Sequence, residues 1–308
     1  MSQDVIKTVR TLLKEKQHLI RVIPNHPLLS SFTIQNTREY QEDRFDVRDM
    51  TIHHTHYLLL TICDGHGGAH SSEYCIHLFP SLVEDMLKHN KHLPIAELLR
   101  QALLETIDQY DKITVGNTLR TMTDKDLAKL GRQLKSKKIE TAGTTLATIL
   151  IDITHRLAWA MSLGDSRIGW FVGDIYNQTP DQKPDPYQPL VHRFIVAKDR
   201  YGEYRVQPRN GDGPRINLSS SVGDNHPGLL GCMKRTPTLT PIHFENQEFR
   251  CVVGSDGFWD AQKVAPKLMK RLLQMPEMFQ MKESAALFTD FAKERVHDNV
   301  TVITCYIR

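Results

Sequence analysis

Residues 57–68 read YLLLTICDGHGG, which combines an apolar run with an unusual loop. The apolar run is of a length that suits one buried strand and is short for a helix. The loop after it contains three glycines, and each glycine loses much backbone freedom on folding. A simple turn explains such a loop poorly. We therefore expect Asp64 to end a buried strand at a functional site.

The same change from apolar strand to polar loop recurs along the chain. Strand patterns occupy residues 31–35, 44–47, 145–153, 156–164, 250–257 and 299–307. Helical spacing occupies residues 69–90, 94–113, 263–275 and 283–296. Runs of strands joined by hairpins and separated by helices favour antiparallel sheets covered by helices over a parallel sheet of βαβ units. The sequence therefore predicts an α+β fold.

The size of the chain, 308 residues, fits one large domain or two small ones. We see no linker, so we predict a helical extension over residues 1–30 and a single domain over residues 31–308. Residues 173–232 are rich in Pro, Gly, Asp and Asn and are predicted to form an irregular insertion. The formal charge of +3 neither indicates a nucleic-acid partner nor excludes an anionic substrate.

The N-terminus shows no targeting signal. No segment approaches the roughly 18 apolar residues of a membrane span, and residues 1–23 lack the apolar stretch and cleavage site of a secretory signal. Their amphipathic pattern predicts a packed terminal helix, with a membrane-surface or partner helix as the alternative. We expect a cytoplasmic monomer that binds no nucleic acid; nuclear residence is also compatible with the sequence.

The cysteines argue against two classes of protein. They are odd in number and contain no CxxC pair, which favours buried thiols in a reducing compartment over disulfides or a zinc site. None begins the Cys-x5-Arg loop of a thiolate phosphatase. They are Cys63, Cys75, Cys232, Cys251 and Cys305.

Carboxylates lie at the ends of four predicted strands. These are Asp64, Asp165, Asp256 and Asp298, and the loop after the first strand adds Glu42 and Asp43. Carboxylates at neighbouring strand ends repel one another unless they are protonated or neutralised by a cation. Sites rich in oxygen select hard ions such as Mg²⁺ and Mn²⁺. A single Asp-Gly pair is usually a turn, but that explanation would have to hold independently at four places.

Six motifs together resemble the metal-dependent serine/threonine protein phosphatase family, type 2C. In the family's order they are Arg38-x-x-x-Glu42-Asp43, DGHGG at 64–68, TAGTT at 141–145, LGDSR at 163–167, SDGFWD at 255–260 and HDNVTVI at 297–303. Each motif alone is weak, whereas six in register are specific, and they extend over nearly the whole chain. The resemblance implies a central β-sandwich of two antiparallel sheets flanked by helices, in four layers α-β-β-α, with a two-metal site at one end.

The resemblance also implies which residues bind the two metal ions. Asp64, Asp256 and Asp298 would ligate or orient the first ion. Glu42, Asp64 and the carbonyl of Gly65 would hold the second, so that Asp64 would bridge the two.

Other matching positions would support the ions or contact the substrate. Asp43 would act on an ion through an intervening water, and Asp165 and Asp260 match positions that hold a third, weaker ion in some members. Arg38 would bind the substrate phosphate, because a guanidinium can grip two phosphoryl oxygens at once. His66 would be the candidate general acid.

These roles predict hydrolysis of phosphoserine and phosphothreonine on proteins. Two Mg²⁺ or Mn²⁺ ions about 4 Å apart would activate a water that attacks phosphorus, without a covalent intermediate. One alternative is a catalytically weak or inactive family member that binds phosphoproteins as a regulator, but the intact ligand set argues against it. Another is an unrelated metal-binding structural domain, which would require the order of the six motifs to be accidental.

Two segments depart from the family pattern. In LSSSVGD, residues 218–224, Ser220 stands where the family has an arginine near the metal centre. The family's aspartate-histidine-lysine-proline element is present only as residues 181–184, DQKP. Neither change removes a predicted metal ligand, so we expect retained catalysis with an altered substrate preference.

Three further features invite functional interpretations that we do not favour. His53, His54 and His56 suggest a metal site but lie in a predicted hairpin turn. Residues 223–226, GDNH, resemble a fragment of the other large group of serine/threonine phosphatases, whose accompanying motifs are missing, so we interpret them as coincidence. The lysine-rich residues 125–138 are predicted to be a solvated helix face, with attraction of acidic partners as the alternative.

Overall fold

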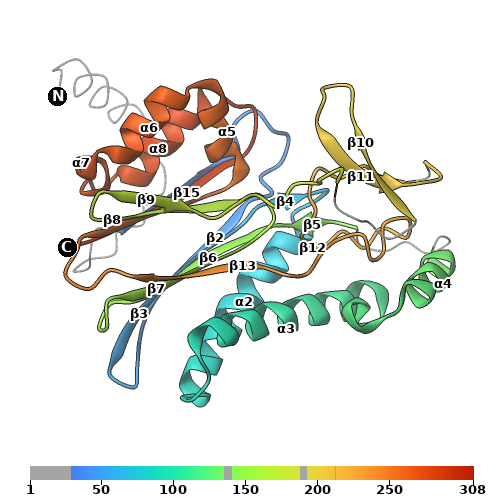
Figure 1. Ribbon diagram of the computed structural model, residues 1–308, viewed down its shortest axis with the longest axis horizontal. Helices are drawn as coiled ribbons and strands as arrows, with labels where there is room; N and C mark the ends of the chain where they lie inside the picture. Colours follow the sequence, from blue (N-terminus) through green and yellow to red (C-terminus); the bar gives the residue numbers. More distant parts are fainter. Residues whose placement is uncertain (1–28, 135–140, 188–192, 212) are drawn as a thin grey trace.

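The computed structural model describes residues 29–134, 141–187, 193–211 and 213–308. Two five-stranded antiparallel sheets form its centre, and helices cover the outer face of each sheet (Figure 1). The predicted α+β sandwich in four layers is therefore confirmed. The helical extension predicted for the N-terminus lies outside the described residues, apart from its last two positions.

The two sheets differ in which parts of the chain they combine. The first sheet has the order β1 (Leu29–Ile34), β15 (Val300–Ile307), β14 (Phe249–Gly254), β8 (Arg167–Val172) and β9 (Ile175–Gln178). The second sheet has the order β13 (Thr238–His243), β7 (Leu157–Leu163), β6 (Leu146–Asp152), β3 (Thr55–Cys63) and β2 (Arg44–Ile52). The first sheet thus joins strands from both ends of the chain.

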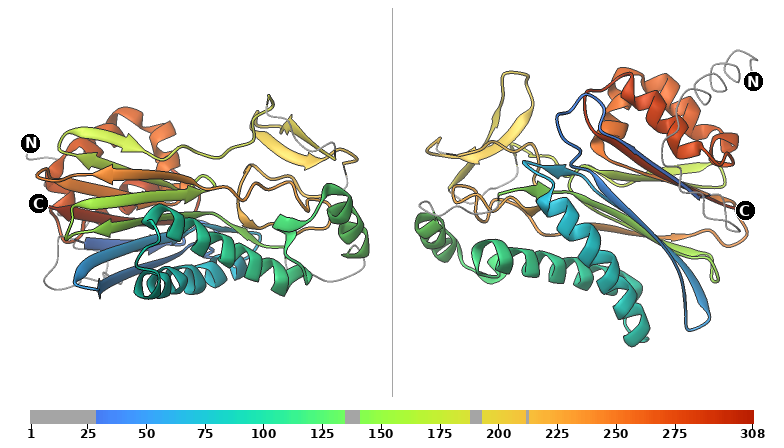
Figure 2. Two further views of the ribbon diagram at one scale, coloured as in Figure 1. Left: turned by 60° about the horizontal axis from the view of Figure 1, so that its bottom comes forward. Right: turned by 180° about the vertical axis from the view of Figure 1, so that it is seen from behind.

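Each sheet has its own helical layer. Helices α2 (His70–His89) and α3 (Ile95–Val115) cover the second sheet. The first sheet is covered by α5 (Asp256–Val264), α6 (Pro266–Gln274), α7 (Pro276–Phe279) and α8 (Ser284–Lys293). The views in Figure 2 show the same layers from two other sides.

The strand β3 shows why its sequence is continuously apolar. Successive side chains of a strand point to opposite faces of the sheet. Leu58, Leu60 and Ile62 pack between the two sheets, whereas Leu59 and Cys63 pack with residues of α2 and α3. Both faces are buried, so the usual alternation of apolar and polar residues is absent.

The β2–β3 hairpin has a tighter turn than predicted. β2 runs to Ile52 and β3 begins at Thr55, so only His53 and His54 form the turn, both with positive φ. The Nε2 atom of His53 lies 2.9 Å from the carbonyl oxygen of Lys88, and that of His56 lies 2.8 Å from Asp49 Oδ1. These contacts explain the histidines without a metal ion.

The segment 173–232 contains more regular structure than predicted. Residues 175–178 form β9, which pairs with β8 in the first sheet. Strands β10 (Phe194–Lys198) and β11 (Tyr204–Pro208) form a hairpin, and β12 (Val222–Gly223) joins a small sheet with β5 (Gly143–Thr144) and β4 (Gly65–His66). This segment also has a buried apolar cluster of its own, which includes Phe194, Leu218 and Leu229.

The lysine-rich segment begins with a helix. A short 3₁₀ turn, η1 (Leu119–Thr121), precedes α4 (Asp124–Leu134), whose leucines Leu127, Leu130 and Leu134 pack with Leu230. The last part of the lysine-rich segment, residues 135–138, lies outside the described residues.

Two expectations drawn from composition agree with the structure. All five cysteines are free and buried. Among the described residues, no helix is both long and apolar enough to span a membrane.

The inter-sheet core gives a first prediction. Leu60→Ala removes a fully buried side chain between the sheets, and such truncations destabilise proteins by about 2–5 kcal/mol. Urea unfolding should show this loss. Ile113→Ala, at a position 63% exposed on α3, should change stability by less than about 0.5 kcal/mol. Equal effects of the two changes would contradict the assigned core.

Candidate functional site

Strand register brings one set of carboxylates to a single edge of the second sheet. The first residue of β2, Arg44, pairs with the last residue of β3, Cys63. The first residue of β6, Leu146, pairs with the last residue of β7, Leu163. Glu42 and Asp43 before β2, Asp64 after β3 and Asp165 after β7 therefore all lie at this edge.

The first sheet ends at the same place. Gly254 at the end of β14 pairs with Arg167 at the start of β8, and Val300 at the start of β15 pairs with Ile34 at the end of β1. The residues just beyond these strand ends include Asp256 and Asp298.

Hydrogen bonds join the two sets of strand ends. The backbone N–H of Asp256 donates to Asp64 Oδ2 over 3.2 Å. The Thr301 hydroxyl donates to Asp43 Oδ2 over 2.7 Å, and the backbone N–H of Glu42 donates to Asn299 Oδ1 over 2.9 Å. Residues from opposite sheets thus form one site at the end of the sandwich.

The DGHGG loop packs tightly against Glu42. The backbone N–H of Gly68 donates to Glu42 Oε1 over 2.6 Å, and the Ser72 hydroxyl donates to the Glu42 carbonyl over 2.5 Å. A Cβ at position 65 would lie 2.6 Å from that same carbonyl. Only glycine fits at Gly65, which explains the residue type in this part of the loop.

The carboxylates perturb one another. Burial, followed by the neighbouring charge of Asp256, holds the pKa of Asp64 well above its usual range. Burial and the charge of Asp165 do the same for the pKa of Asp256. Burial raises the pKa of Asp43 to about 6, although hydrogen bonds from Thr301 and Ser255 oppose the rise. Without a cation, mutual repulsion and burial therefore disfavour the ionised form of these carboxylates.

Three of the predicted site carboxylates form ion pairs with the protein's own cations. Arg38 Nη2 lies 2.6 Å from Asp298 Oδ2, and Lys263 Nζ lies 2.9 Å from Asp260 Oδ1. Lys183 pairs with the buried Asp165.

The two central carboxylates differ from these. Within the part of the chain that the structure describes, neither Asp64 nor Asp256 pairs with a lysine, arginine or histidine. Glu42 and Asp43 likewise form no ion pair among the described residues.

His66 has a partner that the sequence analysis missed. Its Nε2 atom lies 2.8 Å from Oδ1 of the buried Asp224. Burial lowers the pKa of His66, but the charge and hydrogen bond of Asp224 outweigh burial, so the pKa is raised overall. Asp224 lies within residues 223–226, GDNH. The signal that could have found it is its place at the end of LSSSVGD, residues 218–224, which stands where the family has its glycine-aspartate element.

The segments that depart from the family pattern support the site. Gln182 makes two hydrogen bonds to the β7–β8 turn: its backbone N–H donates to the Gly164 carbonyl, and its side-chain Oε1 accepts from the Gly164 N–H, both over 2.9 Å. Asp181 pairs with Arg167. Ser220 is buried, and its backbone forms a single parallel β-bridge with that of Lys234. The next residue, Arg235, donates to the carbonyl of Gly223 over 2.8 Å.

A hollow of about 440 Å³ adjoins the site. Arg38, Asp260 and Asp298 line it together with Gly257, Lys263, Val264, Arg295, Val296 and His297. It therefore brings the predicted phosphate-binding arginine next to two of the predicted metal ligands.

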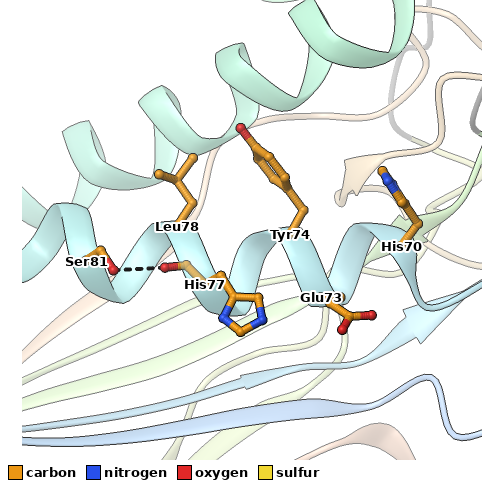
Figure 3. A pocket seen from close by; sticks show the side chains of 6 residues that line it. All are labelled: His70, Glu73, Tyr74, His77, Leu78 and Ser81. Carbon is orange, nitrogen blue, oxygen red and sulfur yellow. Dashed lines mark hydrogen bonds between the residues drawn. The ribbon is translucent and has the colours of Figure 1, made fainter.

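A second hollow of about 480 Å³ lies along α2 (Figure 3). Its lining includes His70, Glu73 and His77, together with Tyr74, Leu78 and Ser81. Tyr74 and Leu78 point toward α3, and the Ser81 hydroxyl donates to the His77 carbonyl over 2.9 Å (Figure 3). It contains none of the strand-end aspartates, so we place the candidate site at the end of the sandwich.

The strand-end carboxylates are suited to binding a metal ion. Among the described residues, no three His, Cys, Asp or Glu side chains are already arranged to hold a metal ion. The donors at the strand ends are nevertheless all oxygen atoms, carry excess negative charge and lie beside a guanidinium. Such a set can attract hard cations and a phosphoryl group.

Comparisons with known sequences point to one family, although no family model matches the chain. Protein phosphatase 1L of Bos taurus is 26% identical over 261 residues, which cover 80% of this chain and 64% of the relative. Protein phosphatase 2C 70 of Arabidopsis thaliana is 25% identical over 261 residues, covering 80% of this chain and 40% of the relative. The chain thus spans less than two thirds of the length of either.

Solved structures share the fold. A serine-threonine phosphatase 2C from Toxoplasma gondii superposes with a TM-score of 0.61 at 18% identity, covering 94% of this chain and 99% of that one. A C. elegans sex-determining protein gives 0.64 at 20% identity, covering 99% and 71%. The catalytic domain of the serine/threonine phosphatase PstP, solved with two manganese ions, gives 0.55 at 17% identity, covering 91% and 98%. The sequence relatives, the shared fold and the ordered motifs agree in making the chain similar to the type 2C family of serine/threonine protein phosphatases.

Proposed function

We propose that this chain hydrolyses phosphoserine and phosphothreonine on proteins with the help of two divalent cations. The observation that carries the proposal is that carboxylates from both sheets meet at one end of the sandwich. There the backbone N–H of Asp256 donates to the Asp64 carboxylate. The names of its sequence relatives support the same activity.

The donor set fits Mg²⁺ or Mn²⁺. Carboxylates and a backbone carbonyl are the ligands that such hard ions prefer, and the two manganese ions bound by PstP support the assignment. We assign Asp64, Asp256 and Asp298 to one ion, and Glu42, Asp64 and the Gly65 carbonyl to the other. Because no three of these side chains already form a ligand group among the described residues, we expect some of them to reorient when an ion binds.

The remaining acidic positions play supporting roles in this proposal. Asp43 is buried and accepts from Thr301, so it would orient a water rather than contact an ion. Asp165 and Asp260 are paired with Lys183 and Lys263. A third ion at these positions would have to displace a lysine. We therefore propose that the active site uses two ions.

Arg38 would bind the substrate phosphate. Its side chain is 52% exposed and lies in the hollow beside Asp298. When cations occupy the site, they would acidify a water and offset the charge on the phosphoryl oxygens. If Asp298 then turned away from Arg38, the guanidinium could donate hydrogen bonds to two phosphoryl oxygens.

The reaction would be a direct displacement at phosphorus. The oxygen of water would form a bond to phosphorus as the bond from phosphorus to the serine or threonine oxygen breaks, and the protons of the water would leave with the released phosphate. The electron pair of the broken bond stays on the leaving oxygen, which takes a proton from His66. His66 follows Gly65 directly, so it lies beside the proposed ions.

Ion binding can be tested without an activity assay. Mn²⁺ or Mg²⁺ at about 100 times its dissociation constant should stabilise the folded chain by about 2.7 kcal/mol, because it relieves repulsion between Asp64 and Asp256. Thermal unfolding with the ion and with chelator measures the effect, and Asp256→Asn should reduce it. An unchanged unfolding midpoint would count against the metal site.

Catalysis should depend on the same residue. Changes around metal ligands typically lower activity 10–100-fold, so Asp256→Asn, which alters a proposed ligand, should reduce phosphate release from a phosphoserine peptide at least about 100-fold. Excess chelator should abolish release by the unmodified chain. Asp290→Asn, at a half-buried carboxylate paired with Lys293 on α8, serves as the control and should stay active. Full turnover in chelator would refute the mechanism, and phosphopeptide binding without release would indicate an inactive binding protein.

The Arg38→Lys variant tests whether phosphate binding depends on the two-pronged shape of the guanidinium or only on its positive charge. Lysine keeps the charge but cannot grip two oxygens, and a hydrogen bond to a charged group contributes about 1.5–3 kcal/mol. We expect kcat/KM to fall about 10–100-fold, with Arg205→Lys on β11 as the control. Steady-state kinetics with a phosphopeptide provides the measurement; wild-type kinetics in Arg38→Lys would exclude the assigned grip.

A further inference from the structure

The contact between His66 and Asp224 joins residues that are far apart in the sequence. The Nε2–Oδ1 distance is 2.8 Å across 158 positions. The Asp224 side chain is only 3% exposed, and the Ser221 hydroxyl donates to its other oxygen. Nδ1 of His66 has no hydrogen-bond partner within the described residues. One ring nitrogen is therefore held by the protein, and the other makes no hydrogen bond in the part of the chain that the structure describes.

A small sheet fixes this contact from the backbone. Position 143 in β5 pairs with His66 in β4 on one side and with Gly223 in β12 on the other. A Cβ on Gly143 would clash with both the His66 ring and the Asp224 carboxylate. The imidazole and the carboxylate can therefore meet only because position 143 lacks a side chain.

The loop that carries Asp224 is also held firmly. Asp224 adopts a left-handed conformation, with φ of 56°, and its backbone N–H donates to the Ala142 carbonyl over 3.1 Å. Arg235 donates to the carbonyls of Ser221 and Gly223. These hydrogen bonds hold the loop in the left-handed turn that aspartate can adopt.

We propose that Asp224 is a positioning residue that orients His66 for proton donation. Its carboxylate accepts a hydrogen bond from Nε2–H, which leaves Nδ1 as the nitrogen that protonates the leaving oxygen. A carboxylate behind an imidazole fixes both the tautomer and the ring orientation. This inference rests on the proposed phosphatase activity.

The proton balance of the step is simple. As the bond between phosphorus and the serine oxygen breaks, its electron pair goes to that oxygen, and the proton moves to it from Nδ1. His66 is left neutral with its proton on Nε2, and Asp224 stays ionised throughout. A leaving group that is stable as an anion, such as an aryl oxide, needs no such proton.

The leaving group therefore provides the test. Asp224→Asn and Asp224→Ala should lower kcat for a phosphoserine peptide about 10–100-fold, since positioned acids contribute about 10²–10⁴-fold. KM should stay near its original value, and hydrolysis of p-nitrophenyl phosphate should change little. His66→Ala should show the same selectivity. Adding it to Asp224→Ala should cause little further loss, because residues that act as one unit are not additive.

The chain offers a matched control. Asp152 is also buried and lies 2.7 Å from a histidine, His155, at the β6–β7 turn. It pairs with Tyr57 near the start of β3, whereas Asp64 follows the end of that strand. Asp152→Asn should therefore leave both substrates unaffected. Equal losses on both substrates in Asp224→Asn, or additivity with His66→Ala, would overturn the proposal.

Imidazole ¹⁵N spectra separate this inference from the proposed function. In the Mg²⁺-supplemented chain, neutral His66 should carry its proton on Nε2, and Asp224→Ala should remove that preference. If neutral His66 in the unmodified chain carried its proton on Nδ1 instead of Nε2, the positioning role would be refuted whether or not the chain is active. Absence of chelator-sensitive phosphate release from the unmodified chain would instead refute the phosphatase activity and leave the spectra to decide the role of Asp224.

Discussion

The repulsion between partly buried carboxylates at one end of the sandwich is the constraint on which the site depends. Asp64 and Asp256 follow strands of different sheets, and the backbone N–H of Asp256 donates to the Asp64 carboxylate. Burying charges is unfavourable unless they are paired or coordinated. The strands that precede them nevertheless fix these positions, because β3 pairs with β2 and β6, and β14 pairs with β15 and β8. The fold thus holds together a set of charges that a cation would stabilise.

The sequence located these carboxylates because they lie at the ends of long, regular strands. β3 and β14 have both faces buried, and their apolar runs end just before Asp64 and Asp256. Where a strand is long and apolar, its end is visible in the sequence, and an antiparallel register brings such ends together. The ligand positions and the sandwich could therefore be predicted together.

Asp224 could not be located in this way. Its contact with His66 depends on three strands of two residues each, which are too short to produce a hydrophobic pattern. The strands β9 and β13 were missed for a related reason: exposed and half-buried residues interrupt their apolar character. Lys183 and Arg235 lie in loops, and only the folded chain shows which carboxylate or carbonyl each one meets.

The ion pairs at the site suggest an order of binding. Asp298, Asp165 and Asp260 are neutralised by Arg38, Lys183 and Lys263. A cation must compete with these partners but meets no such competitor at the central pair, Asp64 and Asp256. The first ion should therefore enter at the central pair. Because Asp298 also holds Arg38, an ion that recruits Asp298 frees the guanidinium. In the proposed mechanism, the guanidinium would therefore become available to a phosphate only once a cation had bound, which would disfavour binding of phosphoprotein to the metal-free chain.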